Sequence, residues 1–250
     1  MRSRGTPQAQ GLGARAAALA ALQAVFFSER PLTEALDQSL SKAKLEPRDV
    51  AFARAIVMAT LRRLGEIDHV IANFLREPLP VRSGPAELIL RIAAAELLFL
   101  DVAPHAAVSS AVALADKDHR GKHFKGLINA VARRIAGEGK AMLAGLDAER
   151  LNTPPWAWDN WVTAYGEETT RAIAKAHSVE PPLDISVKSD AEAWAKKLDA
   201  EVLPTGTLRR AAGGRIEDLP GYTEGAWWIQ DAAAAIPVTL LGPVKGKTVI

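Results

Sequence analysis

Hydrophobic residues recur at three- and four-residue steps from Leu12 to about Leu146, which is the period of an α-helix with one buried face. Prolines and charged turns divide this stretch, and Pro47 and Pro104 stand where a helix is expected to begin. Gly137 and Gly139 are expected to end the last helix. The pattern predicts a compact all-helical domain of about six or seven helices.

Two predicted helices in this domain differ in character. Residues 88–100 are apolar on most faces, and a helix that is apolar all round is usually buried. We therefore expect this helix at the centre of the domain. A second, longer helix is predicted to begin at Pro47 and to run toward Phe74 and Leu75.

The pattern changes at Asn152, where two prolines follow one threonine. Three tryptophans crowd one short predicted helix, and residues 167–177 supply another. Residues 183–188 alternate apolar and polar side chains as a half-buried strand does. A small mixed α/β unit is therefore predicted. Its remaining expected elements are a helix at 190–198, strands at 207–212, 227–229 and 247–250, and a helix capped by Asp231.

The amino-acid composition limits which classes of protein this chain can belong to. Hydrophobic residues make up 48% and charged residues 24%, as in globular chains. The absence of cysteine excludes a disulfide scaffold, a thiolate metal site and a cysteine nucleophile. Charges interrupt every apolar stretch before the roughly 18 residues that a membrane span needs. We expect a cytoplasmic monomer with no membrane partner.

Positive charge is concentrated in residues 1–150, which hold 21 Lys and Arg against 16 Asp and Glu. Residues 117–134, the basic segment, are the richest window. Cations at a loop and helix start can bind phosphates, helped by the amides of Gly121 and Gly126, although a solvated helix face is the alternative. Arginines near the N-terminus can add a basic arm. The candidate RNA-binding residues are Arg2, Arg4, Arg15, Lys117, Arg120, Lys122, Lys125, Arg133 and Arg134.

Other candidate chemistry is weaker. His119 and His123 have the four-residue spacing of metal ligands on a helix, but no carboxylate completes a metal motif, so we expect no metal site. The glycines at 242 and 246 are separated by three residues where a phosphate loop has four. Trp227 and Trp228 can stack on unpaired bases, although core packing is the commoner role of tryptophan.

Several short motifs together resemble a known family. The run Phe124-Lys-Gly-Leu-Ile-Asn-Ala-Val-Ala-Arg-Arg-Ile135 is similar to the final-helix signature of the NusB-like RNA-binding fold. Later motifs fall in the order seen in Sun/Fmu-type ribosomal RNA cytosine-C5 methyltransferases. They are Asn152-Thr-Pro-Pro-Trp156, Trp161 with Tyr165-Gly, Pro181-Pro-Leu183, Leu219-Pro-Gly-Tyr222 and Trp227-Trp-Ile-Gln-Asp-Ala-Ala233.

This resemblance implies three segments. Residues 1–148 would be an all-α NusB-like RNA-binding domain, and residues 149–226 a small α/β RNA-recognition linker domain. Residues 227–250 would begin a Rossmann-like methyltransferase domain, which binds S-adenosylmethionine in the full-length family member. Gln230 and Asp231 match the family's Gln-Asp pair at the entrance to the catalytic domain, so they are expected next to the site.

The family's reaction uses a cysteine thiolate and a glycine-rich cofactor loop, and the chain has neither. We therefore expect the chain alone to be inactive, with no catalytic residue and no bound cofactor. The first hypothesis is the RNA-recognising portion of such a methyltransferase, with ribosomal RNA as partner. The alternatives are a free-standing NusB-like RNA-binding or transcription-associated protein, and a helical scaffold that binds proteins through residues 88–100.

Overall fold

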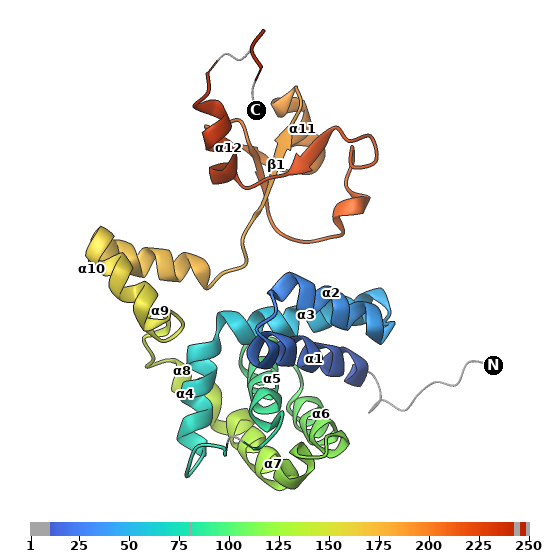
Figure 1. Ribbon diagram of the computed structural model, residues 1–250, viewed down its shortest axis with the longest axis vertical. Helices are drawn as coiled ribbons and strands as arrows, with labels where there is room; N and C mark the ends of the chain where they lie inside the picture. Colours follow the sequence, from blue (N-terminus) through green and yellow to red (C-terminus); the bar gives the residue numbers. More distant parts are fainter. Residues whose placement is uncertain (1–10, 81, 243–245, 249–250) are drawn as a thin grey trace, which may run out of the picture. The chain divides into compact units, whose positions relative to one another are not determined.

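A computed structural model describes residues 11–80, 82–242 and 246–248, and the chain divides into two compact units (Figure 1). We call Met1–Ser178 the helical unit and Val179–Ile250 the sheet unit. Each has its own hydrophobic core. The predicted segments 1–148, 149–226 and 227–250 follow the domains of a family rather than contacts within this chain, and they stay a prediction.

The helical unit confirms the predicted all-α fold. Pro47 and Pro104 occupy the first turns of α3 and α6, where the missing proline amide costs nothing. The helices are α1 (Leu12–Ser28), α2 (Leu32–Ala43), α3 (Pro47–Arg62), α4 (Leu64–Phe74), α5 (Ala86–Phe99), α6 (Pro104–Lys117), α7 (Lys125–Arg134), α8 (Lys140–Leu143), α9 (Ala148–Leu151) and α10 (Pro155–His177), with a 3-10 turn at Gly121–Phe124 and a π-helical turn at Ile135–Gly139.

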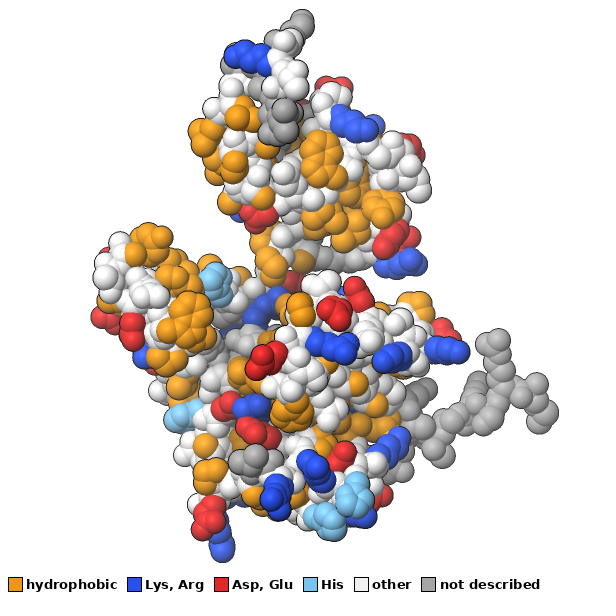
Figure 2. Space-filling model, in the orientation of Figure 1, with side chains coloured by type: hydrophobic (Ala, Val, Ile, Leu, Met, Phe, Trp, Pro, Cys, Tyr) orange, Lys and Arg blue, Asp and Glu red, His pale blue; other side chains and the backbone are white. Residues whose placement is uncertain are grey.

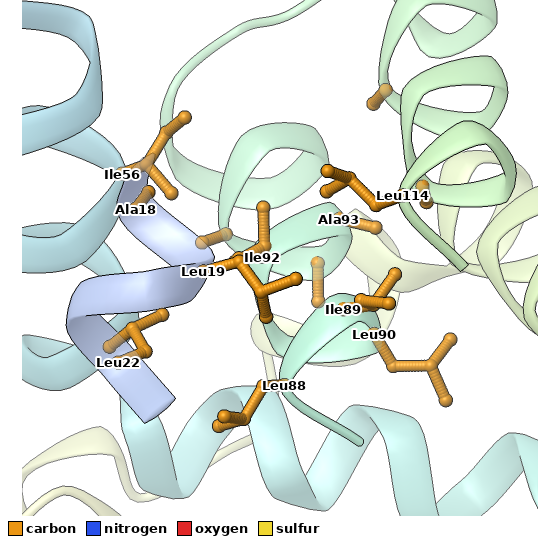
Figure 3. Packing of buried hydrophobic residues seen from close by; sticks show 14 of the residues in the cluster. Ala18, Leu19, Leu22, Ile56, Leu88, Ile89, Leu90, Ile92, Ala93 and Leu114 are labelled. Carbon is orange, nitrogen blue, oxygen red and sulfur yellow. The ribbon is translucent and has the colours of Figure 1, made fainter. Parts of the chain in front are cut away.

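Helix α5 forms the centre of this unit and contacts α1, α3, α4, α6 and α7 (Figure 1). Apart from Glu87 and Arg91, every side chain from position 86 to 98 is buried. Figure 3 shows Leu88, Ile92 and Ala93 of α5 among side chains of α1, α3 and α6. The prediction of a central buried helix is confirmed. A scaffold that binds proteins through residues 88–100 is excluded, because that segment has almost no exposed surface.

A buried ion pair joins α1 to α5. Arg15 Nε lies 2.7 Å from Glu96 Oε1, and the two side chains are 5% and 1% exposed. The contact is an ion pair without the alignment of a hydrogen bond. The Arg15 guanidinium also lies 5.0 Å from the centre of the Phe52 ring. Burial raises the pKa of Glu96, and the positive charge of Arg15 opposes that rise.

The prediction of a single helix from Pro47 to Leu75 is wrong, because Arg63 interrupts the helix and separates α3 from α4. Gly65, in the first turn of α4, has no room for a Cβ because the carbonyl oxygen of Leu151 lies there. Asn152 Nδ2 donates to Glu66 Oε2 at 2.7 Å, and Asn152 Oδ1 accepts from the Glu66 amide at 3.1 Å. These contacts hold the α9 segment against α4. Because the two segments are about 86 residues apart in the sequence, hydrophobic periodicity could not predict this contact.

Gly137 and Gly139 do not end the last helix of the bundle, contrary to the sequence-based expectation. Helix α7 continues through the π-helical turn into α8. Gly139 has a helical φ of −64°, and a Cβ there would lie 2.9 Å from Leu98 Cδ2. This glycine therefore permits close packing against α5 instead of a cap.

Helix α10 contains the two short helices that the sequence predicts. Gly166 interrupts it with φ 79° and ψ 166°, a conformation that side chains with a Cβ rarely adopt. Trp158 is buried before this kink, and the guanidinium groups of Arg150 and Arg171 lie 5.2 and 5.3 Å from its ring centre. Arg171 Nη1 also lies 3.0 Å from Asp147 Oδ1. These contacts attach both halves of α10 to the segment that precedes it.

The sheet unit is a four-stranded antiparallel sheet in the order β2-β3-β1-β4. Helix α11 (Ala191–Leu198) packs on this sheet, with Ala195 and Leu198 in one core with Ile185, Leu208 and Trp227. The strand at 183–188, the 207–212 strand and the 227–229 strand are confirmed. The elements are β1 (Leu183–Val187), α11 (Ala191–Leu198), β2 (Glu201–Val202), β3 (Leu208–Arg210), a 3-10 turn at Ile216–Asp218, β4 (Trp227–Ile229) and α12 (Ala232–Thr239).

Two features of the sheet unit differ from the prediction. Strand β2 was not predicted, because two residues are too few to show an alternating pattern. In the strand expected at 247–250, Lys247 and Thr248 lie in no regular element, and Val249 and Ile250 are outside the described residues.

Removing one member of the Arg15–Glu96 pair is expected to cost more stability than replacing both. Arg15→Met leaves a buried carboxylate without its cation, which typically costs about 3–5 kcal/mol. Adding Glu96→Leu is expected to restore most of that free energy of unfolding, because both side chains are then apolar. Urea unfolding at pH 7 measures the difference. A double variant no more stable than Arg15→Met would contradict the assignment.

The same pair predicts a dependence on pH. Burial raises the folded pKa of Glu96 above its ordinary value of 4.5, so the folded state holds this proton more tightly than the unfolded state. Without Arg15, that rise is larger. The unfolding free energy of Arg15→Met is therefore expected to fall further below wild type as the pH increases above 4.5. The double variant lacks this carboxyl, so it should gain stability relative to wild type over the same range. A series of urea titrations checks both.

Asp184 is expected to stabilise the sheet unit above acid pH. Its carboxylate accepts hydrogen bonds from Arg209 Nε and Nη2 at 2.7 and 2.8 Å and from the Ala232 amide at 3.0 Å. The Arg209 guanidinium holds the pKa of Asp184 below its ordinary 3.8, so this stabilisation is lost as the pH falls through the lowered value.

Asp184→Asn is therefore expected to cost about 1–3 kcal/mol at pH 7, and the difference from wild type should shrink as the pH falls below 3.8. Urea unfolding followed by the NMR signal of the Trp227 indole N–H, which donates to the Pro220 carbonyl, reports on this unit. Glu192→Gln on the exposed side of α11 is the matched control. Equal losses in the two variants would show that the Asp184 contacts carry no special stability.

Candidate nucleic-acid interface

The basic segment, residues 117–134, spans the end of α6, the 3-10 turn and α7. All six of its Lys and Arg side chains are exposed. Three have neighbours: Lys125 Nζ lies 2.7 Å from Asp116 Oδ1, Arg134 Nε lies 3.4 Å from Glu138 Oε1, and Arg133 Nε donates to Asn129 Oδ1 at 3.3 Å. Within the described part of the chain, Lys117, Arg120 and Lys122 form no ion pair. These three present the most available charge.

Asp118 shapes the turn that carries these cations. Its Oδ1 accepts hydrogen bonds from the amides of Arg120 at 2.9 Å and Gly121 at 2.7 Å. The Gly121 amide is therefore occupied, and the expectation that it binds phosphate is wrong. Gly126 is exposed in the first turn of α7, with open space around it. Gly84 also lies close to this turn, because a Cβ there would come within 2.8 Å of Arg120 Cβ.

The three N-terminal arginines do not extend this surface within the described residues. Arg15 is 4% exposed and paired with Glu96, so it cannot contact a phosphate on the surface. The sequence pattern missed its burial because arginine is usually exposed. Arg2 and Arg4 lie outside the described residues.

A groove of about 630 Å³ lies beside the basic segment, between α6 and the helix formed by α7 and the following turn. We call it the α6–α7 groove. Lys, Arg and His side chains gather over these helices on the face shown in Figure 2. Lys125 holds the pKa of Asp116, on the rim, below its usual range by hydrogen bonding to it. The groove is lined by Pro104, His105, Val108, Ser109, Val112, Ala113, Asp116, Lys125, Asn129, Arg133 and Ala136.

Sequence reasoning found only two of these lining residues, Lys125 and Arg133. The signal for the others is their spacing, since 105, 109, 112 and 116 share one face of a helix and 125, 129, 133 and 136 share one face of another. Helical spacing gives the faces but not which two faces meet. The pairing of α6 with α7 comes from the tertiary structure.

In the sheet unit, Gln230 and Asp231 connect β4 to α12. Gln230 Oε1 accepts hydrogen bonds from Ser186 Oγ at 2.9 Å and Trp228 Nε1 at 3.1 Å. Asp231 Oδ1 accepts from the amides of Ala233 and Ala234, which confirms that it caps the helix. Both residues therefore hold the exit from the sheet in a defined conformation.

The two neighbouring tryptophans have different environments, because successive side chains of a strand point to opposite faces. Trp227 is 4% exposed, and its indole donates to the Pro220 carbonyl. Trp228 is 47% exposed. Base stacking is excluded for the buried Trp227 and remains open to Trp228.

The described ranges of the chain contain neither a metal-binding cluster nor a helix that could span a membrane. No group of three His, Asp or Glu side chains there could hold a metal ion. His119 and His123 instead make an edge-to-face contact at 6.4 Å between ring centres. No helix among these residues is long and apolar enough to span a bilayer.

Comparison with known sequences finds relatives over most of the chain. It is 27% identical to "Ribosomal RNA small subunit methyltransferase B" of Pseudomonas putida, over 94% of this chain and 56% of the relative. The protein of the same name from Cronobacter sakazakii is 28% identical over 83% of this chain and 51% of the relative. The chain thus spans about half the length of these curated relatives.

Among solved structures, the crystal structure of PH0851 matches with a TM-score of 0.61 and 17% sequence identity. The match covers 97% of this chain and 57% of that one. At this identity the likeness shows the fold alone.

A family model gives the assignment. The model of the NusB family matches residues 12–137, about half of the chain. These residues begin with α1, include the central α5, and end in the turn after α7 that borders the groove. The matched region thus contains the helical core, the basic segment and the α6–α7 groove together, and the chain belongs to the NusB family.

Proposed function

We propose that this chain is the RNA-binding and substrate-positioning portion of a Sun/Fmu-type, S-adenosylmethionine-dependent 16S-type ribosomal RNA cytosine-C5 methyltransferase. The observation that carries the proposal is the extent of the similarity. It covers 94% of the chain, whereas the NusB family match ends at residue 137. The sheet unit is therefore shared with proteins named as ribosomal RNA methyltransferases.

The exposed cations support a role in holding RNA. Phosphate contacts from Lys and Arg supply most of the sequence-independent affinity for nucleic acid and release counterions. Lys117, Arg120 and Lys122 can make such contacts without breaking an ion pair, and Lys125 has to give up only an exposed one. In this role the basic segment positions the RNA strand and does not read its sequence.

In this proposal, methyl transfer is carried out by a part of the full-length family member other than the described residues of this chain. A Rossmann-like cofactor site needs a parallel sheet and a glycine-rich turn before a helix, and the described sheet is antiparallel throughout. These residues therefore do not fit S-adenosylmethionine. The chain also has no cysteine for attack on the cytosine ring. We expect the chain alone to bind RNA and to transfer no methyl group.

Salt dependence tests the RNA contact. The triple variant Lys117→Ala, Arg120→Ala, Lys122→Ala is expected to weaken binding to transcribed 16S ribosomal RNA. It should also reduce the slope of log affinity against log salt by about 2–3, since each lost phosphate contact removes about one unit. Electrophoretic mobility shifts at several salt concentrations measure both quantities.

The control removes the same net charge elsewhere, with Lys42→Ala, Arg76→Ala and Lys196→Ala, all exposed positions outside the basic segment. This control is expected to keep the wild-type slope to within about one unit. Equal changes of slope in the two triple variants would show that the basic segment is not the RNA contact.

A further inference from the structure

We propose that the α6–α7 groove holds one unpaired base of the bound RNA strand. This inference rests on the proposed function. It adds a site that binds one base, next to the surface that holds the phosphates. Three observations carry it: the size and lining of the groove, the unused hydrogen-bonding groups in it, and the charge around it.

The size of the groove is sufficient for a planar aromatic ring. The volume of about 630 Å³ lies within the range of small-molecule pockets. Val108, Val112 and Ala113 of α6 and Ala136 beyond α7 supply apolar surface on both sides. The faces of a nucleobase are apolar and its edge is polar, so such walls can cover its faces.

Polar groups are available for the edge of the base. Asn129 Oδ1 accepts a hydrogen bond from Arg133. Among the described residues, Asn129 Nδ2 donates to no acceptor, so its two N–H groups are available. Ser109 Oγ donates to the Ala106 carbonyl at 3.3 Å and keeps its lone pairs for a donor. The exposed His105 adds a third polar side chain at the rim. These groups match the carbonyl, amino and ring-nitrogen atoms of an unpaired base.

Charge complementarity favours a nucleic acid. The phosphates on either side of an inserted base must remain in solvent near cations, and Lys125 and Arg133 lie on the rim. Lys117, Arg120 and Lys122 continue the positive surface along the neighbouring turn. A base in the groove with its phosphates on this surface satisfies the apolar and the charged parts of the site together.

Filling the groove separates base binding from phosphate binding. Ala113→Phe and Ala136→Phe place a ring in the groove from opposite walls, and Ala130→Phe is the control at an exposed position of α7 outside the lining. Fluorescence anisotropy of the full 250-residue chain is measured with two labelled probes, a single-stranded RNA 10-mer and a 10-mer of the same backbone without bases.

Each groove-filling variant is expected to bind the RNA about tenfold more weakly than wild type, with an unchanged salt slope and unchanged affinity for the abasic probe. The control should bind both probes as wild type does. Wild-type affinity of both filling variants for both probes would overturn the groove site and leave the proposed function standing. No affinity of wild type for either probe would sink both.

Two further measurements keep the test decisive. If both filling variants fail to fold by circular dichroism, RNA with 4-thiouridine is cross-linked to the wild-type chain, and the attached peptides are expected within residues 104–136. Cross-links confined to other segments would overturn the site. If the filling variants keep RNA affinity but lose binding to small ribosomal subunits that contain protein, the groove accepts a peptide, which also overturns the proposal.

Discussion

The pairing of Arg15 with Glu96 constrains how α1 packs on α5 in the helical unit. A buried charge without a partner costs several kcal/mol, so α1 can pack on α5 only where the two side chains meet. Helix α5 in turn contacts α3, α4, α6 and α7. The walls of the α6–α7 groove are therefore built on the same central helix that carries the buried partner of Arg15.

The energetic cost of burying a charge also separates the arginines and lysines that can bind an anion from those that cannot. Exposed ion pairs are worth about 0–1 kcal/mol, so Lys125 can exchange Asp116 for a phosphate at little cost. Arg15 cannot exchange Glu96 in this way, because both groups are removed from water. Burial thus determines which Lys and Arg side chains of residues 1–150 are available to bind an anion. The presence of a positive charge alone does not determine this.

The sheet unit is organised around a similar contact. Asp184 joins β1 to β3 through Arg209 and receives the first amide of α12, so one carboxylate links the sheet to the helix that follows it. Gln230 lies next to this link and ties Ser186 to Trp228. The exit from the sheet is therefore held by side chains of β1 and β4, two strands far apart in the sequence.

The sequence by itself determined most of the elements. Helical spacing predicted the all-α unit and the central buried helix, and alternation predicted β1, because burial on one face follows the period of each element. The two helices on either side of Gly166 and the strands β3 and β4 were also expected. It also predicted the cap at Asp231 and identified the basic segment, whose six Lys and Arg side chains are exposed in the structure.

Only the tertiary structure decided which faces meet. It made Gly139 a packing residue against Leu98, made Gly65 a site of close approach to Leu151, and buried Arg15 against Glu96. It also brought one face of α6 against one face of α7 to form the groove. These outcomes depend on contacts between residues far apart in the chain, and local spacing carries no information about such partners.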